Sequence, residues 1–460
     1  MKCRLRFDEG TLLVDGDPDA TEVLRSALTF DDRVGLWRAS ASRYAGIVRV
    51  LYAFHAEIED CARNYRILDC ELHSPLRPMA HQLAALDAWK RAKCRGCVVM
   101  PTGSGKTFFA FLAMRTVRRS TIVVVPTIDL MHQWATLLED AFQCPVGMLG
   151  GGSSDVRDVT VSTYDSAVIH MNRIGDRFGL AVFDECHHLP GPVNRTCAAM
   201  CIAPYRLGLS ATLDLPPESA DVLRDMVGPT VYDADMRELE AARVLAPYKT
   251  VRLRLALGAR EAEEYREARE KYVSFIRANR IDFQSERGWS DFLIACVRRP
   301  DGRDAFQAYL RQRTIARCGE AKMTALWRII RENPSARILI FTADNDAAYK
   351  IGESFCLPVL THKTKAAERK DFLARFRSGD YPVLVTSKVL NEGVDVPEAN
   401  IGIVVSGSGC TREHVQRLGR ILRRKEGKEA VLYELVSEGT SEIGVSDRRR
   451  RHQAYERRRR

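Results

Sequence analysis

The sequence lacks any run of about 18 apolar residues, the length that a membrane-spanning helix needs. Residues 1–9 contain acids where a secretory signal peptide has its apolar core. No internal repeat with a period of roughly 20–50 residues is visible either. We therefore expect a soluble intracellular protein that makes no membrane contact, cytoplasmic and nucleoid-associated in a prokaryote or nuclear in a eukaryote.

A disulfide framework is also missing. The 13 Cys are an odd number scattered over 460 residues, which is typical of reduced thiols in a reducing compartment. Cys94 and Cys97 form a CxxC pair, but no second CxxC exists to complete a four-thiolate zinc site. Cys97 opens an apolar run, so we expect it to face a core. A structural role is favoured over a metal or redox role, and no Cys spacing requires an iron–sulfur cluster.

The formal net charge of +10 is concentrated at the carboxyl terminus. Residues 448–460 contain eight Arg and one Glu, and 8 − 1 accounts for +7 of the +10. Clustered Arg attracts phosphate backbones because it releases condensed counterions. A solvated tail without a fixed partner explains the same composition equally well. Both interpretations stay open.

Short apolar runs that end in polar or small residues recur in two parts of the chain. They cover residues 97–101, 121–126, 159–163, 180–184 and 207–211, and later 337–341, 358–360, 382–386, 401–405 and 430–435. Helical patterns lie between several of them, for example at 107–119 and 129–142. Such alternation predicts an α/β fold with two parallel sheets, each covered by helices on both faces.

The remaining segments separate these two lobes. Residues 260–279 read as a charged amphipathic helix, and no strand signal follows until about residue 318. We therefore predict a small mixed amino-terminal domain at 1–70 and a first lobe at 71–230. A linker and helical insert at 231–325 precede a second lobe at 326–442 and a basic tail at 443–460.

A glycine-rich loop lies between the first strand and the following helix of the first lobe. Gly103 and Gly105 let backbone N–H groups curl around an anion, and the helix start adds partial positive charge. Lys106 can reach the β- and γ-phosphates, and the Thr107 hydroxyl can ligate Mg²⁺. The sequence thus predicts ATP and Mg²⁺ as ligands. The residues expected to hold ATP are Thr102, Gly103, Ser104, Gly105, Lys106 and Thr107.

An apolar strand later delivers Asp184 at its carboxyl end, where ligands bind in open α/β sheets. A carboxylate suits Mg²⁺, which prefers oxygen, so Asp184 is the predicted metal ligand beside Thr107. Glu185 is placed to polarise the attacking water, and His187 to couple the nucleotide site to later motifs. The H-E-x-x-H spacing of a zinc site is absent, although a His pair follows the two acids.

The order of these motifs, followed by Ser210 and Thr212 in Leu-Ser-Ala-Thr, resembles that of superfamily 2 helicases, which have two RecA-like lobes. Residues 383–397 resemble motif V, and residues 416–423 resemble motif VI. The resemblance implies that Ser210 and Thr212 act with His187 in coupling. It implies further nucleotide-binding and catalytic residues in the second lobe: Gly393, Asp395, Gln416, Arg420 and Arg423.

Arg420 and Arg423 are three residues apart, so a helix would show both on one face. From a facing lobe they could reach the γ-phosphate as arginine fingers and stabilise the charge of the transition state. A solvated basic helix would not explain Gln416 and Gly419 at these spacings.

Within that superfamily, most of the chain resembles the XPB helicases, especially the compact archaeal and bacterial ones. Residues 30–44 resemble the end of a damage-recognition domain, and residues 263–278 the start of a helical thumb-like insert. Residues 360–362, 406–409 and 416–423 are closer to XPB than to other helicases. The resemblance implies a DNA helicase or translocase of 3′–5′ polarity that acts in DNA repair on single-stranded or forked DNA. It also implies a repair nuclease as partner, or the factor TFIIH in a eukaryote, and we expect a monomer.

The resemblance places further contacts on particular residues. Gln82 is expected to contact adenine, although the spacing of Arg and Gln around it is wider than in the usual family motif. Hydroxyl groups and loop amides contact phosphate without reading bases, so sequence preference should be weak. The residues expected to contact the nucleic-acid strand are Pro126, Thr127, Thr163, Thr361 and His362.

Two features keep other functions open. XPB proteins carry an Arg-Glu-Asp element after the Ser/Thr-Ala-Thr motif. In this chain, residues 213–218 contain acidic residues but lack the Arg of that element. An ATP-gated scaffold that remodels DNA with little unwinding is therefore an alternative. The Asp-Glu-Cys-His motif also occurs in RNA helicases of that type, although motif VI favours DNA. A motor lobe of a restriction or phage-type system is the third alternative.

Overall fold

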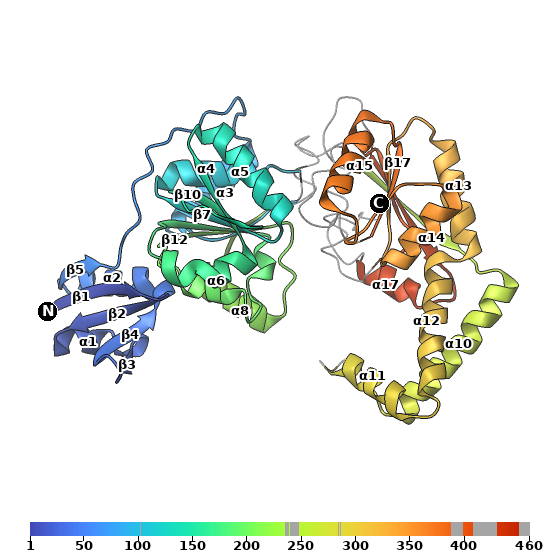
Figure 1. The fold of residues 1–460 in the computed structure, drawn as a ribbon, viewed down its shortest axis with the longest axis horizontal. Coiled ribbons are helices and arrows are strands. Elements are labelled where there is room, and N and C mark those ends of the chain that lie inside the picture. The colour runs from blue at the N-terminus through green and yellow to red at the C-terminus, as the bar shows by residue number, and fades with distance from the viewer. Residues whose placement is uncertain are drawn as a thin grey trace, which may run out of the picture. The chain divides into compact units, whose positions relative to one another are not determined.

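The computed structural model describes residues 1–101, 103–234, 239, 248–283, 285, 287–387, 399–407 and 430–449. These residues form two compact units, one within Met1–Ala241 and another that begins at Ala242. Each unit contains a mainly parallel sheet between layers of helices (Figure 1), which confirms the predicted α/β fold. In the described part of the chain, no helix has the length and apolar character needed to cross a bilayer.

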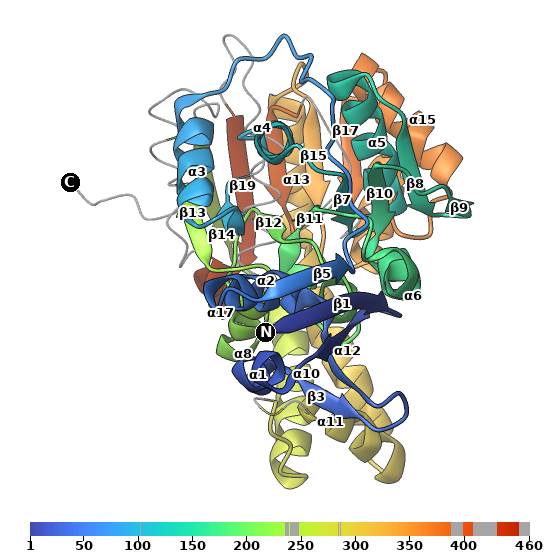
Figure 2. The ribbon, with the colours of Figure 1, turned by 90° about the vertical axis from the view of Figure 1, so that its left-hand side faces the viewer.

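The amino-terminal domain is a small mixed sheet with the strand order β3-β4-β2-β1-β5. Its strands β1, β3 and β5 are labelled in Figure 2. In β1, Cys3 and Leu5 point into the core while Lys2 and Arg4 point outward, the period of two expected of a half-buried strand. Ile202 from the next domain completes the core. The elements are β1 (Lys2–Asp8), β2 (Thr11–Gly16), α1 (Pro18–Val23), β3 (Thr29–Asp31), β4 (Leu36–Ser40), α2 (Tyr44–Ala53) and β5 (Glu57–Cys61).

The first lobe is built on a sheet with the order β13-β6-β12-β11-β7-β10-β8-β9, in which only the β8–β9 pair is antiparallel among the described strands. Its strands are β6 (Arg95–Val99), β7 (Thr121–Val125), β8 (Val146–Gly150), β9 (Ser153–Ser154), β10 (Val159–Thr163), β11 (Leu180–Asp184), β12 (Tyr205–Ser210) and β13 (Thr230–Asp233). Its helices are α3 (Ala80–Arg91), α4 (Lys106–Val117), α5 (Ile128–Phe142), α6 (Tyr164–Ile174), α7 (Arg195–Ala199) and α8 (Pro217–Met226).

Helices cover both faces of this sheet. On one face, α6, α7 and α8 pack against β6, β7 and β11 in a single apolar cluster. On the other face lie α3, α4 and α5 (Figure 1). All five residues of β7 and of β11 are buried, as expected of central strands in a parallel sheet covered on both sides.

The five predicted strands of this lobe are confirmed as β6, β7, β10, β11 and β12. The short strands β8 and β13 were not predicted. β8 contains two glycines in five residues, which weakens both propensity and periodicity signals. Cys97 is almost fully buried in the lobe core, as its place at the start of an apolar run suggested.

The second lobe has the strand order β14-β19-β18-β15-β17-β16, all in parallel pairs. α13 and α14 pack on one face. α15 connects strands in the opposite direction and lies on the other side (Figure 1), as a right-handed crossover requires. The elements are β14 (Tyr248–Leu255), α13 (Glu320–Glu332), β15 (Ile338–Phe341), α14 (Asn345–Phe355), β16 (Val359–Leu360), α15 (Ala366–Ser378), β17 (Val383–Thr386), β18 (Ile401–Val404), β19 (Ala430–Ser437) and α17 (Glu442–Arg449).

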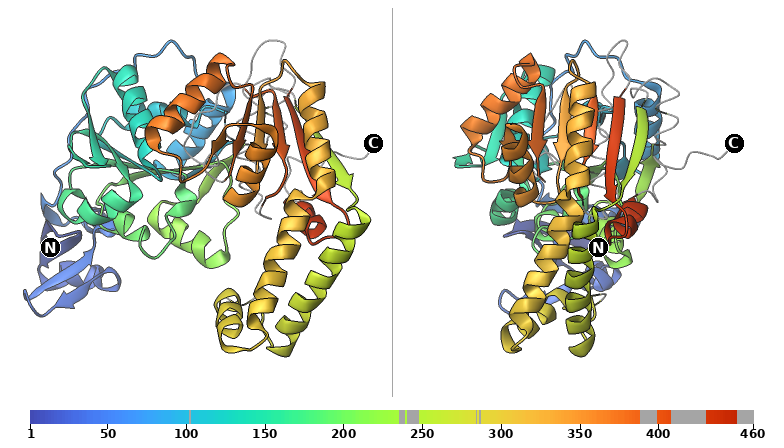
Figure 3. Two further views of the ribbon diagram at one scale, coloured as in Figure 1. Left: turned by 45° about the vertical axis from the view of Figure 1, so that its right-hand side comes forward. Right: turned by 90° about the vertical axis from the view of Figure 1, so that its right-hand side faces the viewer.

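The helical insert precedes α13 in this unit. α10 (Ala259–Ala278) and α12 (Gly302–Cys318) run side by side, and α11 (Gly288–Arg298) lies at their far end (Figure 3). The insert has its own aromatic core around Phe275 and Phe292. Such a core lets the insert hold its shape where it projects from the sheet.

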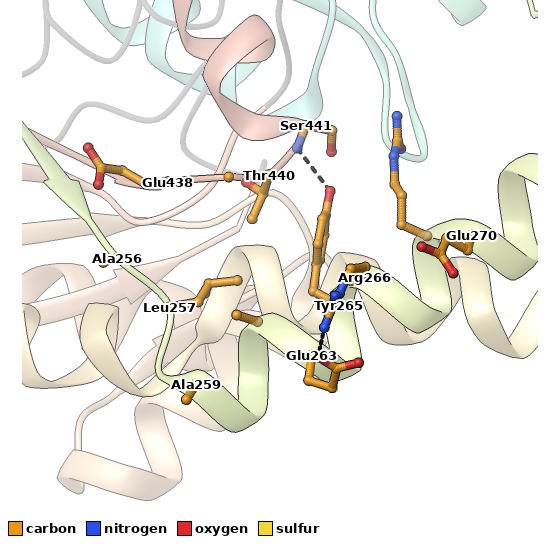
Figure 4. Close-up of a pocket in the computed structure, with 13 residues that line it drawn as sticks. Ala256, Leu257, Ala259, Glu263, Tyr265, Arg266, Glu270, Glu438, Thr440 and Ser441 are labelled. Atoms are coloured by element: carbon orange, nitrogen blue, oxygen red, sulfur yellow. Dashed lines mark hydrogen bonds and ion pairs between the residues drawn. The ribbon is translucent and has the colours of Figure 1, made fainter.

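The base of the insert is tied to the second lobe by hydrogen bonds. The Ser441 N–H donates to Tyr265 Oη at 2.9 Å (Figure 4), and Ser437 Oγ donates to the Ala316 carbonyl at 2.8 Å. A groove of about 960 Å³ runs along this junction beside Arg266 and Glu270. None of the predicted site residues lines this groove.

The segment 231–325, expected to be a linker and helical insert, also contributes a strand to the second lobe. β14 pairs with β19 along its whole length. Its residues alternate between polar and apolar from Thr250 to Leu255, which is the signal of a half-buried strand. The segment 443–460, expected to be a basic tail, begins within α17.

A buried ion pair closes the second lobe. Lys322 is 1% exposed, and its ammonium group donates to the carboxylate of Glu442 and, at 2.7 Å, to the carbonyl of Val405. Removing one member of such a pair leaves an uncompensated charge in the interior. The pair therefore joins α13 and α17 to the end of β18.

We expect Lys322→Met to lower the free energy of unfolding of this unit by about 3–5 kcal/mol, because Glu442 would stay buried without its cation. Urea unfolding followed by circular dichroism measures the change. Arg375→Met is the matched control, since Arg375 pairs with Asp371 where both side chains are about half exposed, and such pairs contribute about 1 kcal/mol or less. Equal shifts in the two variants would show that Lys322–Glu442 does not stabilise the lobe.

Candidate functional site

The described site residues that were predicted in the first lobe lie at or beside one edge of its sheet. The strands β6, β12, β11, β7, β10 and β8 are consecutive neighbours, and their carboxyl ends form this edge. The edge carries, in that order, the phosphate loop after β6, Ser210 at the end of β12, Asp184 at the end of β11, Pro126 and Thr127 after β7, and Thr163 at the end of β10. Ligands of open α/β sheets bind at this edge.

The phosphate loop adopts a backbone conformation that requires glycine. Gly103 and Gly105 have φ angles of +89° and +86°, and Gly105 caps α4 without a side chain that accepts from the helix. The first N–H groups of α4, at Lys106 and Thr107, therefore lack a side-chain cap. A Cβ on Gly105 would lie 2.4 Å from Gln82 Nε2.

Two side chains of α3 hold the loop from behind. Gln82 Nε2 donates to the carbonyls of Ser104 at 3.3 Å and Gly105 at 3.2 Å, and its Oε1 accepts from the Met79 N–H at 2.9 Å. His81 Nε2 lies 2.9 Å from the same Ser104 carbonyl. The adenine contact predicted for Gln82 stays a prediction. His81 was not predicted, since nothing in its sequence position signals a contact 23 residues away.

Asp184 is almost completely buried, and donors surround its carboxylate. Trp134 Nε1 donates to Oδ2 at 2.9 Å and the Glu185 N–H donates to Oδ1 at 3.0 Å. Burial, followed by the charge of Glu185, raises the pKa of Asp184 to about 6, and the charge of Lys106 opposes this shift. A cation beside Asp184 would offset the cost of burying the charged carboxylate.

The backbone after Asp184 is strained. Glu185 has a φ angle of +47°, the left-handed region that residues with a Cβ rarely adopt. Strain of this kind persists where surrounding contacts over-determine it, and it is frequent at functional sites. The turn directs the Glu185 side chain toward His187, whose Nδ1 lies 3.4 Å from Glu185 Oε2.

The predicted coupling residues lie together. His187 Nδ1 is 3.1 Å from Ser210 Oγ, and Ser210 Oγ donates to the Thr212 carbonyl at 2.7 Å. The Met100 N–H at the start of the phosphate loop donates to the Ser210 carbonyl at 3.0 Å, and Lys106 Nζ donates to the Met100 carbonyl at 3.2 Å. A continuous chain of hydrogen bonds thus connects the acid motif with the phosphate loop.

The predicted strand contacts of this lobe begin two helices. Thr127 caps α5 by accepting from the Leu130 N–H at 3.3 Å, and Thr163 caps α6 by accepting from the Ser166 N–H at 3.3 Å. Pro126 is half-buried before Thr127. Thr163 pairs with Val125 across β10 and β7, so the two helix starts are neighbours on the edge.

A glycine turn that sequence reasoning did not single out lies against both starts. Gly150 ends β8, Gly151 and Gly152 follow it, and the three have φ angles of +141°, +58° and +91°. A Cβ on Gly150 would lie 3.0 Å from Thr163 Oγ1, and one on Gly151 would lie 3.1 Å from an Ile128 side-chain carbon. Three consecutive glycines were a visible signal of close backbone approach. We call Thr127, Thr163 and these glycines the glycine patch.

The second lobe places its two predicted strand contacts differently. The Thr361 side chain is fully buried, and its Oγ1 accepts from the Lys363 N–H at 3.2 Å and lies 3.0 Å from Tyr349 Oη. His362 is exposed, and its Nδ1 lies 3.2 Å from the side-chain Nδ2 of Asn345. Thr361 therefore shapes the turn, while the His362 ring faces solvent.

The other predicted residues lie outside the described part of the chain. They are Thr102 of the phosphate loop, Gly393 and Asp395 of the motif V segment, and Gln416, Arg420 and Arg423 of the motif VI segment. Their roles stay predictions. Among the described residues, no group of three or more His, Cys, Asp or Glu side chains could hold a metal ion without a further ligand.

The residues that are described fit a magnesium–triphosphate ligand. The loop offers uncapped N–H groups, the Lys106 ammonium and the Thr107 hydroxyl, and the buried Asp184 carboxylate faces the same edge. Phosphate oxygens can supply the ligands that a single carboxylate leaves open, which is how Mg²⁺ is usually bound at such sites. The CxxC pair does not take part, because Cys97 is in the core.

Three family models match the chain. Residues 5–62 match the damage recognition domain of the xeroderma pigmentosum group B helicase. Residues 75–215 match the res subunit of type III restriction enzymes, and residues 307–456 match the ERCC3/RAD25/XPB C-terminal helicase.

Whole proteins are similar as well. The chain is 35% identical to the DNA 3′-5′ translocase XPB2 of Sulfurisphaera tokodaii over 97% of this chain and 99% of that protein. It is 29% identical to the DNA 3′-5′ helicase XPB of Mycobacterium tuberculosis over 80% of this chain and 62% of that protein. The crystal structure of the Pyrococcus furiosus Hef helicase domain has the same fold, with a TM-score of 0.57, 19% identity, and coverage of 81% of this chain and 98% of that one.

We expect Gly105→Ala to lower the affinity for a fluorescent ATP analogue at least about tenfold, because an L side chain is strained at this φ and meets Gln82. A fluorescence titration measures the affinity. Gly35→Ala is the matched control: Gly35 also has a positive φ of +66°, but nothing lies within 4 Å of its added Cβ. Equal affinities of the two variants would contradict the role assigned to the loop.

Proposed function

The chain belongs to the XPB family of helicases, and we propose that it converts ATP hydrolysis into 3′–5′ movement along DNA during DNA repair. The observation that carries the proposal is the division of one sheet edge. The strand ends of β6, β12 and β11 carry the nucleotide residues, and those of β7, β10 and β8 carry the glycine patch. Two ligands that bind to the same sheet edge can respond to each other through the residues between them.

The first lobe would bind ATP through its loop and acids. The loop N–H groups and Lys106 neutralise the phosphates, and Thr107 and Asp184 hold the accompanying Mg²⁺. The bound ion would add its positive charge next to the phosphates, where negative charge accumulates during hydrolysis. Glu185 orients the attacking water, and His187 connects its carboxylate with Ser210.

The second lobe would complete the site in the manner of the family. Arg420 and Arg423 would stabilise the γ-phosphate as arginine fingers, with Gln416, Gly393 and Asp395 as further contacts. ATP would then join the lobes, and hydrolysis would release them. This is a hinge motion that a ligand drives, and one small step along the strand accompanies each cycle.

The nucleic-acid strand would contact the glycine patch of the first lobe and the exposed His362 side chain of the second lobe. Backbone N–H groups at helix starts and glycine turns contact phosphates without reading bases. We therefore expect weak sequence preference on single-stranded or forked DNA. A repair nuclease as partner and a monomeric state are part of the proposal by family resemblance.

A second candidate function is supported by the segment after Thr212. Leu213 and Leu215 pack against the lobe core, which leaves Asp214 and Glu218 as the exposed charged side chains. Acids repel a DNA backbone and replace the Arg-Glu-Asp element of other XPB proteins. This observation favours an ATP-gated scaffold that translocates or remodels DNA with little strand separation.

We expect Lys106→Ala to lower DNA-stimulated ATP hydrolysis about 10²-fold or more, because the phosphates lose a half-buried cation that stabilises the transition state. Phosphate release with and without single-stranded DNA measures the rate. Lys93→Ala, on an exposed turn of the same lobe, is the control and should keep its activity. Wild-type rates in Lys106→Ala would end the motor proposal.

We expect single-stranded or forked DNA to stimulate the ATPase at least about tenfold more than RNA at equal nucleotide concentration. ATPase rates on single-stranded, forked and bubble DNA and on RNA measure this preference, and a strand-displacement assay runs beside them. Greater stimulation by RNA than by DNA would favour the alternative that the protein is an RNA helicase. ATPase activity without displaced strand would select the scaffold over the helicase.

A further inference from the structure

Two buried aromatic side chains converge on Asp184 from different helices. Trp134 of α5 donates its indole N–H to the Asp184 carboxylate at 2.9 Å. Tyr164 of α6 donates its hydroxyl to the Asp184 main-chain carbonyl at 3.1 Å. Trp134 is 2% exposed and Tyr164 is 3% exposed, so water does not compete for either bond.

The same two helices begin at the glycine patch. Thr127 is the cap of α5, seven residues before Trp134, a distance of about 10 Å along a helix. Thr163 is the cap of α6, directly before Tyr164. Gly150 and Gly151 lie against both starts, so a strand seated there would act on both helices together.

A helix transmits displacement because its backbone is stiff. Trp134 is buried in the core, where its ring lies edge-on to that of Phe111 at 6.2 Å between centroids. A shift of α5 therefore changes the geometry of the bond to Asp184. In a buried environment this geometry matters strongly, since a charged carboxylate depends on its donors there.

A purely structural role for the two side chains makes a different prediction. If they only support the core, removing either donor lowers stability and affects all activities alike. If they transmit binding, the response of the ATPase to DNA falls more than stability or DNA affinity. The two roles are separable because Trp89 and Tyr44 are buried aromatic donors whose hydrogen bonds go to residues other than Asp184.

We propose that Trp134 and Tyr164 are positioning residues that transmit nucleic-acid binding at the glycine patch to Asp184 through α5 and α6. The inference rests on the proposed function, because it assumes that DNA stimulates the ATPase. It assigns the stimulation to two hydrogen bonds within the first lobe, apart from any contact with the second lobe. Phe at position 164 keeps the ring and removes the donor, and Phe at position 134 keeps an aromatic but smaller side chain and removes the donor.

The test compares Trp134→Phe and Tyr164→Phe with two matched controls. Trp89→Phe removes an equally buried indole donor, whose partner at 3.0 Å is the Arg206 carbonyl. Tyr44→Phe removes a buried hydroxyl that donates to Asp60 at 2.5 Å in the amino-terminal domain. All four variants and the full-length wild type are measured for thermal unfolding, DNA affinity by fluorescence anisotropy, and ATPase rate with and without single-stranded DNA.

We expect the ratio of DNA-stimulated to basal ATPase rate to fall about tenfold or more in Trp134→Phe and several-fold in Tyr164→Phe, because a bond to a charged group is lost in the first variant. DNA affinity should stay within about twofold of the wild type, and the controls should keep the wild-type ratio. Tyr164→Phe, which loses a single oxygen, carries the test if Trp134→Phe does not fold.

A second readout does not depend on turnover. The chain has five Trp, and Trp134 is the one bonded to Asp184. Addition of single-stranded DNA without nucleotide should change the intrinsic fluorescence of the wild type. This change should be largely lost in Trp134→Phe and kept in Trp89→Phe. An unchanged response in Trp134→Phe would overturn the transmission.

The two proposals can fail separately. A wild type that DNA does not stimulate would overturn the proposed function and the inference together. A stimulated wild type whose stimulation survives in Trp134→Phe and Tyr164→Phe as well as in the controls would overturn the inference alone. If the stimulation falls equally in the controls, the inference is also overturned, because the two hydrogen bonds then only support the structure.

Discussion

The Asp184 carboxylate lies where water hardly reaches it, and this constraint organises the first lobe. A buried charge is costly unless donors and cations surround it. Trp134 and the Glu185 N–H meet the carboxylate directly, and Lys106 lies close enough to oppose the rise of its pKa. These groups come from a helix, a strained turn and the phosphate loop. The positions of these three elements are therefore linked, because each supplies a group that stabilises the Asp184 charge.

The parallel sheet explains why these elements meet. The neighbouring strands β6, β12, β11, β7, β10 and β8 are parallel. The loops that follow their carboxyl ends therefore all lie at the same edge of the sheet. In the proposed function, the strand order separates this edge into a half that binds the nucleotide and a half that binds the nucleic acid, with Asp184 at their boundary. Communication between the two ligands then needs only short rigid elements. The hydrogen bonds from α5 and α6 to Asp184 have this character.

Rigid parts are a second requirement of a motor. The first lobe shares its core with the amino-terminal domain through Ile202, and the second lobe is closed by the buried Lys322–Glu442 pair. The insert has an aromatic core of its own and is hydrogen-bonded to the second lobe at its base. A ligand that acts on one end of such a unit moves the whole unit, because packed interiors resist deformation.

The sequence alone determined the α/β class, the strands that carry the phosphate loop and Asp184, and the family, because these depend on local signals: apolar runs, glycines at fixed offsets and motifs in order. The strands β8 and β14 were missed: glycine interrupts the first, and the alternation of polar and apolar residues in the second was a signal that the sequence carried but that was not used. The contacts of His81, Trp134 and Tyr164 could not be predicted from the sequence. Their partners lie 23, 50 and 20 residues away, and only the packing of α3, α5 and α6 on the sheet decides which polar groups meet there.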